Sequence, residues 1–134
     1  VQSKLINGEK PETPLQILLV EDHLLNQIST RKVLTSWSDQ VTVDIADNGK
    51  IALEKLQKKS YDLVLMDIQM PVMDGLEATR VIRQTNAIPI IALTANASKN
   101  EADQCIETGM NAYLAKPFRP QELYDKILGI LVEV

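Results

Sequence analysis

The segment Leu63-Val64-Leu65-Met66-Asp67 is an apolar run that ends in a carboxylate. Its hydrophobicity is continuous rather than alternating, which is typical of a parallel strand covered on both faces of its sheet. Three further runs have the same form and also lead into polar side chains. They are Gln16-Ile17-Leu18-Leu19-Val20 before Glu21-Asp22, Ile88-Pro89-Ile90-Ile91-Ala92-Leu93 before Thr94, and Ala112-Tyr113-Leu114-Ala115 before Lys116.

The segments between these runs have helical spacing, with one additional strand. Helices are predicted at 23–37, 49–59, 75–84, 98–108 and 120–132, and the additional strand at 41–46. Helices between parallel strands form right-handed crossovers, so the pattern predicts an open α/β sandwich. The carboxyl ends of parallel strands meet at one edge of the sheet. We therefore expect Glu21, Asp22, Asp67, Thr94 and Lys116 to gather at that edge.

Length and composition restrict the function. The chain has 134 residues, 45% of them apolar, and a formal charge of −4. This length suits one domain, and the negative charge argues against a general nucleic-acid surface. There is no run of about 18 apolar residues and no secretion signal, so we expect no direct membrane contact and a cytoplasmic location. Residues 1–14 resemble a linker, which leaves 15–134 as the domain. Cys105, the sole cysteine, is interpreted as a packing residue.

The expected cluster of carboxylates at the sheet edge indicates a metal site. Two such charges repel by about 4 kcal/mol at 4 Å for an effective dielectric near 20, so a cation or a proton must offset them. Ligands that are all oxygen favour a hard ion, and room for water and phosphate oxygens favours Mg²⁺. Asp22 and Asp67 would bind it directly and Glu21 through water. An ionised Asp67 can then attack phosphorus, while Lys116 and the Thr94 hydroxyl hold phosphoryl oxygens. No general base is required, and the lone His23 is interpreted as a loop neighbour.

Four blocks of this sequence, in this order and at these spacings, resemble the signature of response-regulator receiver domains. They are Leu19-Val20-Glu21-Asp22, Leu65-Met66-Asp67-Ile68-Gln69-Met70-Pro71-Val72-Met73-Asp74-Gly75, Ala92-Leu93-Thr94-Ala95 and Lys116-Pro117-Phe118. The resemblance covers roughly residues 16 to 132. It implies a flavodoxin-like (βα)5 fold with a doubly wound parallel sheet and strand order 2-1-3-4-5. The acid pair departs slightly from the family, being Glu-Asp where many members have Asp-Asp.

The resemblance also assigns roles to individual residues. Asp67 matches the phosphorylated aspartate, and the backbone carbonyl of Gln69 joins Glu21, Asp22 and Asp67 as a ligand of Mg²⁺. Thr94 and Tyr113 match the switch residues that move on activation, and Lys116 matches the lysine that pairs with the phosphoryl group. A cis peptide bond is implied at Lys116-Pro117. Two positions match those that tune loss of the phosphoryl group to water, namely Gln69 and Asn96.

The helix at 23–37 carries an unusual apolar pattern. Val33, Leu34 and Trp37 lie on one side of the helix, whereas Leu25 and Ile28 lie on the opposite side together with the adjacent Leu24. One interpretation is that Leu24 and Leu25 pack under neighbouring loops. The other is that Leu25 and Ile28 form a docking surface for a helical partner beside the acidic edge.

The blocks most resemble receivers fused to the C-terminal side of hybrid sensor histidine kinases. This implies a phosphorelay that brings the phosphoryl group from phosphohistidine to Asp67, donated by a kinase domain in cis or in trans. The expected partner at Leu25 and Ile28 is a histidine-phosphotransfer protein. The domain would catalyse its own phosphorylation and dephosphorylation, and the linker would tether it to the cytoplasmic part of a kinase, for example a membrane-anchored sensor.

Three alternatives remain open from the sequence. One is a stand-alone response regulator without an output domain. Another is a phosphatase of the haloacid-dehalogenase type, but such enzymes need a second aspartate two residues after the nucleophile, where this chain has Gln69. The third is a flavodoxin-like cofactor carrier or a binding module that cannot be phosphorylated, and the presence of Asp67, Thr94 and Lys116 argues against it.

Overall fold

The computed structural model describes residues 5–6, 10–11, 13–70, 72–95 and 98–132. A parallel sheet of five strands lies at the centre of these residues, in the order β4-β3-β5-β6-β7. Counted along the chain within this sheet, the order is 2-1-3-4-5, so the predicted fold and strand order are confirmed. The strands are β3 (Leu15–Val20), β4 (Val41–Ala46), β5 (Leu63–Asp67), β6 (Ile90–Thr94) and β7 (Ala112–Ala115).

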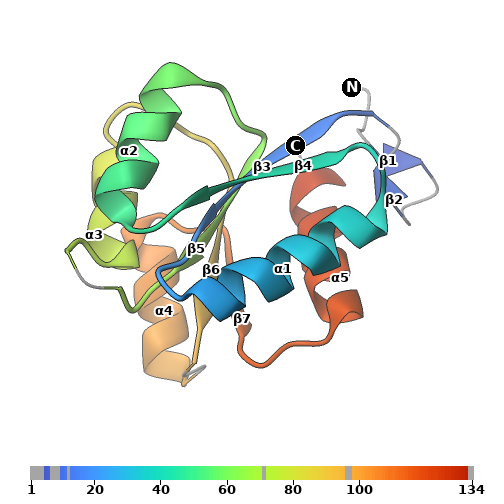
Figure 1. Ribbon diagram of the computed structural model, residues 1–134. Coiled ribbons are helices and arrows are strands. Elements are labelled where there is room, and N and C mark those ends of the chain that lie inside the picture. Colours follow the sequence, from blue (N-terminus) through green and yellow to red (C-terminus); the bar gives the residue numbers. More distant parts are fainter. Residues whose placement is uncertain (1–4, 7–9, 12, 71, 96–97, 133–134) are drawn as a thin grey trace.

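Helices cover both faces of the sheet (Figure 1). One face carries α1 (Leu24–Trp37) and α5 (Pro120–Val132), and the other carries α2 (Gly49–Lys58), α3 (Gly75–Ile82) and α4 (Lys99–Thr108). Alternate strand residues supply the two cores, because successive side chains of a strand point to opposite faces. In β3, Ile17 and Leu19 join the core under α1 and α5, whereas Leu18 and Val20 join the other core. The continuous apolar runs thus reflect a sheet buried on both sides.

The ends of several elements differ from the prediction by a few residues. The helix predicted at 75–84 ends at Ile82, because the Gln84 and Thr85 amides bond to carbonyls three residues back and tighten the last turn. The strand predicted at 88–93 is β6, which runs from Ile90 to Thr94. Asn48 caps α2 and Asp74 caps α3, since each side chain accepts a hydrogen bond from the third helical amide.

The segment predicted to be a linker contains a short antiparallel pair. Its strands are β1 (Leu5–Ile6) and β2 (Lys10–Pro11). The Ser38 hydroxyl, just after α1, donates a hydrogen bond of 2.8 Å to the Pro11 carbonyl. The described part of this segment therefore contacts the domain, and its role as a tether stays a prediction.

Each helix in the described part of the chain is too short or too polar to span a lipid bilayer. Cys105 is fully buried in the core between the sheet, α3 and α4, as its interpretation as a packing residue required. The cytoplasmic location stays a prediction.

Candidate functional site

The register of the sheet brings the predicted site residues together. Val20 pairs with Met66, so Glu21 and Asp67 are the next residues on neighbouring strands. Thr94 pairs with Ala115, which places Lys116 immediately beyond β7 beside the end of β6. The predicted gathering of these side chains at the carboxyl edge is thus a direct consequence of strand order and register.

Two carboxylates at this edge are buried side by side. Glu21 is 1% exposed and Asp67 5% exposed, whereas Asp22 is exposed. Lys116 Nζ lies 3.3 Å from Glu21 Oε1 and 3.6 Å from Asp67 Oδ2, and it is the cation that offsets their repulsion. A lysine between two buried carboxylates neutralises only one of them, which leaves the pair with a net negative charge.

Burial and charge raise the pKa of the Asp67 carboxyl from 3.8 to about 6. Burial in the protein is the main cause, and the negative charge of Glu21 acts in the same direction. Lys116 opposes the shift, as does the hydrogen bond of 3.2 Å that the Gln69 amide donates to Asp67 Oδ1. Without a further cation, keeping both carboxylates ionised at this edge of the sheet is therefore electrostatically unfavourable.

Backbone and side-chain donors fix the position of the acids. The His23 amide donates to Glu21 Oε2 at 3.1 Å, so His23 contacts the site through its backbone, as expected of a loop neighbour. Gln27, buried on α1, donates through Nε2 to the Glu21 carbonyl at 2.6 Å and to Asp47 Oδ1 at 2.8 Å. This amide holds the end of β3 against the loop after β4.

Gly75 allows α3 to begin directly against the end of β5. A Cβ atom at this position would lie 2.4 Å from the Asp67 carbonyl oxygen and 2.9 Å from the Ile68 Cα atom. The Gly75 amide also donates to the Ile68 carbonyl at 2.9 Å. Any side chain here would displace the backbone that carries Asp67.

Thr94 is only 2% exposed at the end of β6. Its carbonyl accepts a hydrogen bond of 2.7 Å from the Lys116 amide, which joins the ends of β6 and β7. Its hydroxyl donates to the carboxylate of Glu101, a residue in the first turn of α4. The Lys116-Pro117 peptide bond is cis, as the sequence resemblance implied.

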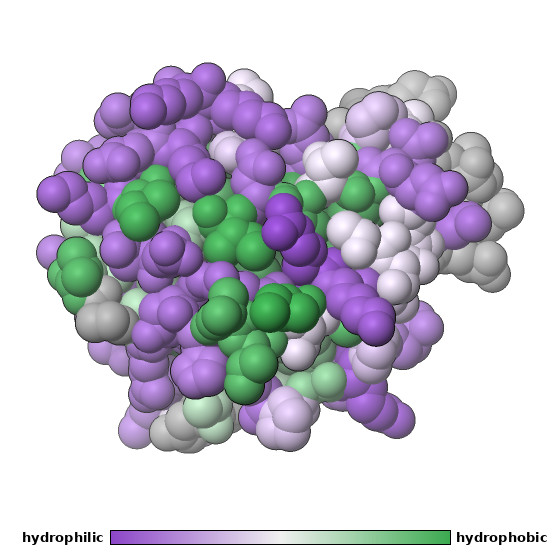
Figure 2. Space-filling view, viewed as in Figure 1, coloured by the Kyte–Doolittle hydropathy of each residue, from purple (hydrophilic) through white to green (hydrophobic). Residues whose placement is uncertain are grey.

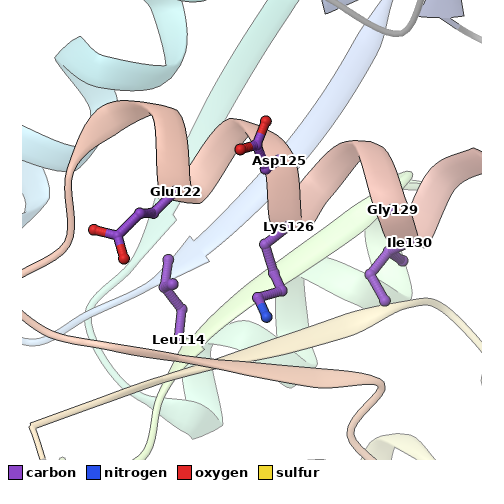
Figure 3. A pocket seen from close by; sticks show the side chains of 6 residues that line it. All are labelled: Leu114, Glu122, Asp125, Lys126, Gly129 and Ile130. Carbon is purple, nitrogen blue, oxygen red and sulfur yellow. The ribbon is translucent and has the colours of Figure 1, made fainter.

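Tyr113 lies on β7 with 37% of its surface exposed, and Lys126 Nζ is 5.9 Å from the centre of its ring. Asn96, predicted to tune loss of the phosphoryl group, lies outside the described residues. A hollow of about 470 Å³ lies between β7 and α5 (Figure 3). It is lined by Leu114, Glu122, Asp125, Lys126, Gly129 and Ile130, so among the described residues it contains no part of the predicted site.

The acidic cluster suits a small divalent cation. One oxygen each from Glu21, Asp22 and Asp67 lies within 4.8 Å of the others. Three negative charges and the single positive charge of Lys116 leave a net charge of −2, which a divalent ion balances. Carboxylate oxygens are hard ligands, and the exposure of Asp22 leaves that side of the cluster open to water. The residues present therefore fit Mg²⁺.

An exposed apolar surface lies on the first half of α1, beside the acidic cluster. We call Leu24, Leu25 and Ile28, which are 66%, 67% and 55% exposed, the α1 patch. Figure 2 shows apolar side chains gathered over this part of the helix. The interpretation that Leu24 and Leu25 pack under neighbouring loops is wrong, because both side chains face solvent.

A family model for the response regulator receiver domain matches residues 17–128. The chain belongs to this family. Receiver domains belong to two-component signal-transduction systems. In hybrid kinases, the receiver domain interacts with the phosphodonor domain of a histidine kinase. The fold, the sheet-edge position of the acids and the motifs of the sequence all agree with this membership.

Curated relatives are histidine kinases that are much longer than this receiver domain. Hybrid signal transduction histidine kinase I of Dictyostelium discoideum is 42% identical over 124 residues, which are 85% of this chain and 7% of the relative. Sensor histidine kinase GacS of Pseudomonas protegens is 37% identical over 119 residues, which are 84% of this chain and 13% of the relative. The chain thus corresponds to a small part of each of these proteins.

Solved structures with the same fold include a magnesium-bound receiver. The receiver domain of a sensor histidine kinase from Pseudomonas aeruginosa, with magnesium coordinated in its active-site cleft, is 41% identical. It aligns with a TM-score of 0.79 over 91% of this chain and 100% of its own. A CheY-like receiver from Methanospirillum hungatei is 29% identical and aligns with a TM-score of 0.81 over 90% of this chain and 96% of its own.

Sequence reasoning missed two residues of this receiver's site, Gln27 and Glu101. Gln27 occupies a helix position that faces the sheet, where a polar residue signals a buried hydrogen-bonding role. Glu101 stands three residues after Ser98, a pattern that signals a helix start rather than a contact with Thr94. Its contact depends on how α4 packs against β6, which the local sequence does not encode.

Proposed function

We propose that this receiver domain accepts a phosphoryl group on Asp67 from a phosphohistidine, with Mg²⁺ held by Glu21, Asp22, Asp67 and the Gln69 backbone carbonyl. The observation that supports this proposal most is the burial of Glu21 and Asp67 around Lys116 at an edge of the sheet. A purely structural site gains nothing from two adjacent buried carboxylates. A phosphoacceptor site uses the same charges to bind a metal and to supply the nucleophile.

The chemistry follows from the groups at the edge. An oxygen of the Asp67 carboxylate forms a bond to phosphorus, the bond between phosphorus and the imidazole nitrogen breaks, and its electron pair stays on that nitrogen. Bound Mg²⁺ supplies positive charge to the carboxylates and to the phosphoryl oxygens. Lys116, which lies 3.6 Å from Asp67 Oδ2, is placed to pair with the new phosphoryl group. Catalysis is then positioning and charge stabilisation.

The switch would transmit this event to the surface. The buried Thr94 hydroxyl moves toward the phosphoryl group, and the Tyr113 side chain turns inward from its half-exposed position. The two residues belong to paired strands, β6 and β7, so a displacement of Thr94 would also displace the neighbouring strand that carries Tyr113. Phosphorylation then selects between two states of the same fold.

The α1 patch is the proposed docking surface for a histidine-phosphotransfer domain. A phosphohistidine must reach Asp67 directly, so its carrier must cover the rim of the site, where α1 begins. Leu25 and Ile28 offer apolar surface at this rim, and burying it in a complex is favourable. The exposed cations Arg31 and Lys32 follow on the same helix, which suits an acidic helical partner.

Labelling with a small phosphodonor tests the acceptor. The purified domain is incubated with acetyl phosphate, with Mg²⁺ or with a chelator, and covalent label is measured. We expect Mg²⁺-dependent labelling that Asp67→Asn abolishes and that Asp103→Asn, at an exposed acid of α4, leaves unchanged. Labelling of the Asp67→Asn variant would move the acceptor elsewhere. Sustained turnover of phosphomonoesters would favour the phosphatase alternative.

Transfer from a protein donor tests the α1 patch. A histidine-phosphotransfer domain, phosphorylated on its histidine, is mixed with the wild type and with Leu25→Ala and Ile28→Ala variants. We expect transfer to slow by about tenfold for the double variant, as for a central interface residue, while labelling by acetyl phosphate is unchanged. Val81→Ala, at an exposed apolar residue of α3, is the matched control. Equal transfer to all variants would exclude this surface.

A further inference from the structure

The Thr94 hydroxyl, at the end of β6, donates a hydrogen bond to the Glu101 carboxylate in the first turn of α4. We propose that Glu101 is a positioning residue that retains the Thr94 hydroxyl in the unphosphorylated protein and so lowers the affinity of the site for a phosphoryl group. This inference rests on the proposed function, because it takes Thr94 as the hydroxyl that binds the phosphoryl oxygen. It assigns a residue of α4 to the control of the acceptor site.

The first observation is the direction of the hydrogen bond. Thr94 is nearly fully buried, and its hydroxyl donates to the Glu101 carboxylate. A hydroxyl carries one proton, so it cannot donate to Glu101 and to a phosphoryl oxygen at the same time. A hydrogen bond to a charged acceptor is also stronger than one to a neutral acceptor. Binding of the phosphoryl group must therefore break this contact.

The second observation is the place of Glu101 in the first turn of α4. Its amide donates to the Ser98 hydroxyl at 3.2 Å, which sets the first turn of α4. Its side chain is half-buried, and its negative charge helps to raise the pKa of the buried Cys105 thiol, after burial itself. The carboxylate thus lies close to the core side of α4, at the end of β6 where Thr94 lies.

Charge and hydrogen bonding act in the same direction at this contact. The carboxylate competes for the proton of Thr94, and its negative charge also repels an incoming phosphoryl group. Removing the whole group should strengthen phosphoryl binding most. Glu101→Gln removes the charge but keeps an oxygen that can accept from Thr94, so it should have an intermediate effect.

Titration with beryllium fluoride, a phosphoryl mimic, in the presence of Mg²⁺ measures this effect. Binding is followed by the amide shifts of β6 and β7. We expect Glu101→Ala to bind the mimic about tenfold more tightly than the wild type, as for the loss of a competing hydrogen bond to a charged group. Glu101→Gln should lie between the two, and Glu107→Gln, at an exposed glutamate of the same helix, should match the wild type.

Repeating the titration in a protein that lacks the Thr94 hydroxyl distinguishes retention of this hydroxyl from a general structural effect of Glu101 on α4. In a Thr94→Ala protein, adding Glu101→Ala should have no larger effect on the affinity than adding Glu101→Gln, because no hydroxyl remains to be retained and only the charge is removed. A full tenfold gain from Glu101→Ala in the protein without Thr94 would overturn the inference. So would Glu101→Ala and Glu101→Gln proteins that both bind the mimic with the affinity of the wild type. If the wild type itself fails to bind the mimic, the proposed acceptor site fails, which is a distinct outcome.

Discussion

The two edges of the central sheet differ in how their polar side chains are paired. At the amino edge, Asp62 Oδ2 accepts from the Gln16 amide at 2.8 Å, and Asn111 Oδ1 accepts from the Ile90 amide at 2.9 Å and from Arg83 Nη2 at 3.0 Å. At the carboxyl edge, Glu21 and Asp67 are buried beside each other and share Lys116. At the first edge, these two side chains each accept from a donor of the protein, whereas at the second two carboxylates lie beside each other with one ammonium group between them.

By this comparison, the polar contacts of the amino edge contribute to stability, whereas the charged cluster of the carboxyl edge is suited to binding a cation. At the amino edge, the side-chain oxygens of Asp62 and Asn111 accept from the protein's own donors, so these contacts should respond only to mutation. The carboxyl edge carries an excess of negative charge, so it should respond to mutation and to an added cation. Dependence of the unfolding free energy on Mg²⁺ is therefore the property that distinguishes the two edges.

The largest effect on stability is expected for Lys116→Ala. Loss of the ammonium leaves Glu21 and Asp67 without the cation that offsets them, which should cost about 2–3 kcal/mol of unfolding free energy in chelator. Mg²⁺ should restore much of this loss. Urea denaturation with chelator and with Mg²⁺ checks both statements, with the exposed Lys59→Ala as control, for which less than about 0.5 kcal/mol is expected. An equal loss in both solutions would remove the distinction between the edges.

A somewhat smaller effect is expected for Gly75→Ala. Its Cβ would meet the Asp67 carbonyl oxygen at 2.4 Å, so the start of α3 must shift, at a cost of about 1–3 kcal/mol. Gly129→Ala is the matched control, because no heavy atom lies within 4 Å of a Cβ there. Gly129 lies on α5 beside the hollow of Figure 3, and an alanine should stabilise the helix by up to about 1 kcal/mol. Thermal denaturation of both variants gives opposite shifts if the packing is as described.

A further prediction concerns the amino edge. Asn111→Ala removes the acceptor for the Ile90 amide and for Arg83, and should cost about 1–2 kcal/mol. The variant should keep the wild-type response to Mg²⁺ and the wild-type labelling by acetyl phosphate. Loss of labelling at full Mg²⁺ would show that the two edges are coupled.

The smallest effect is expected outside both edges, at Asp44. The Tyr61 hydroxyl donates to Asp44 Oδ2 at 2.6 Å, and this bond, followed by that from Lys59, lowers the pKa of Asp44 below 3.8. A lowered carboxyl pKa contributes stability above the unfolded pKa, and this contribution is lost as pH falls through the folded pKa. Tyr61→Phe should cost a few tenths of a kcal/mol at pH 7, since Asp44 is partly exposed. The difference from the wild type should shrink below about pH 4, which denaturation at several pH values measures.

Much of the fold and of the site follows from local sequence. The apolar runs before Glu21, Asp67, Thr94 and Lys116 predicted the strands, and strand order then placed these side chains at one edge. The exposure of Leu25 was left open, because helical spacing places a residue on a face without saying what covers that face. The contact of Glu101 with Thr94 was not predicted, because it depends on the packing of two elements.

The most direct test of the central claim is the chemical identity of the phosphorylated residue. After incubation with acetyl phosphate and Mg²⁺, borohydride reduces an acyl phosphate of aspartate to homoserine, which digestion and mass spectrometry can locate. We expect homoserine at position 67 in the Mg²⁺ sample and aspartate there in the chelator sample. Homoserine at another position, or an unmodified Asp67 after full labelling, would contradict the proposed role of the carboxyl edge.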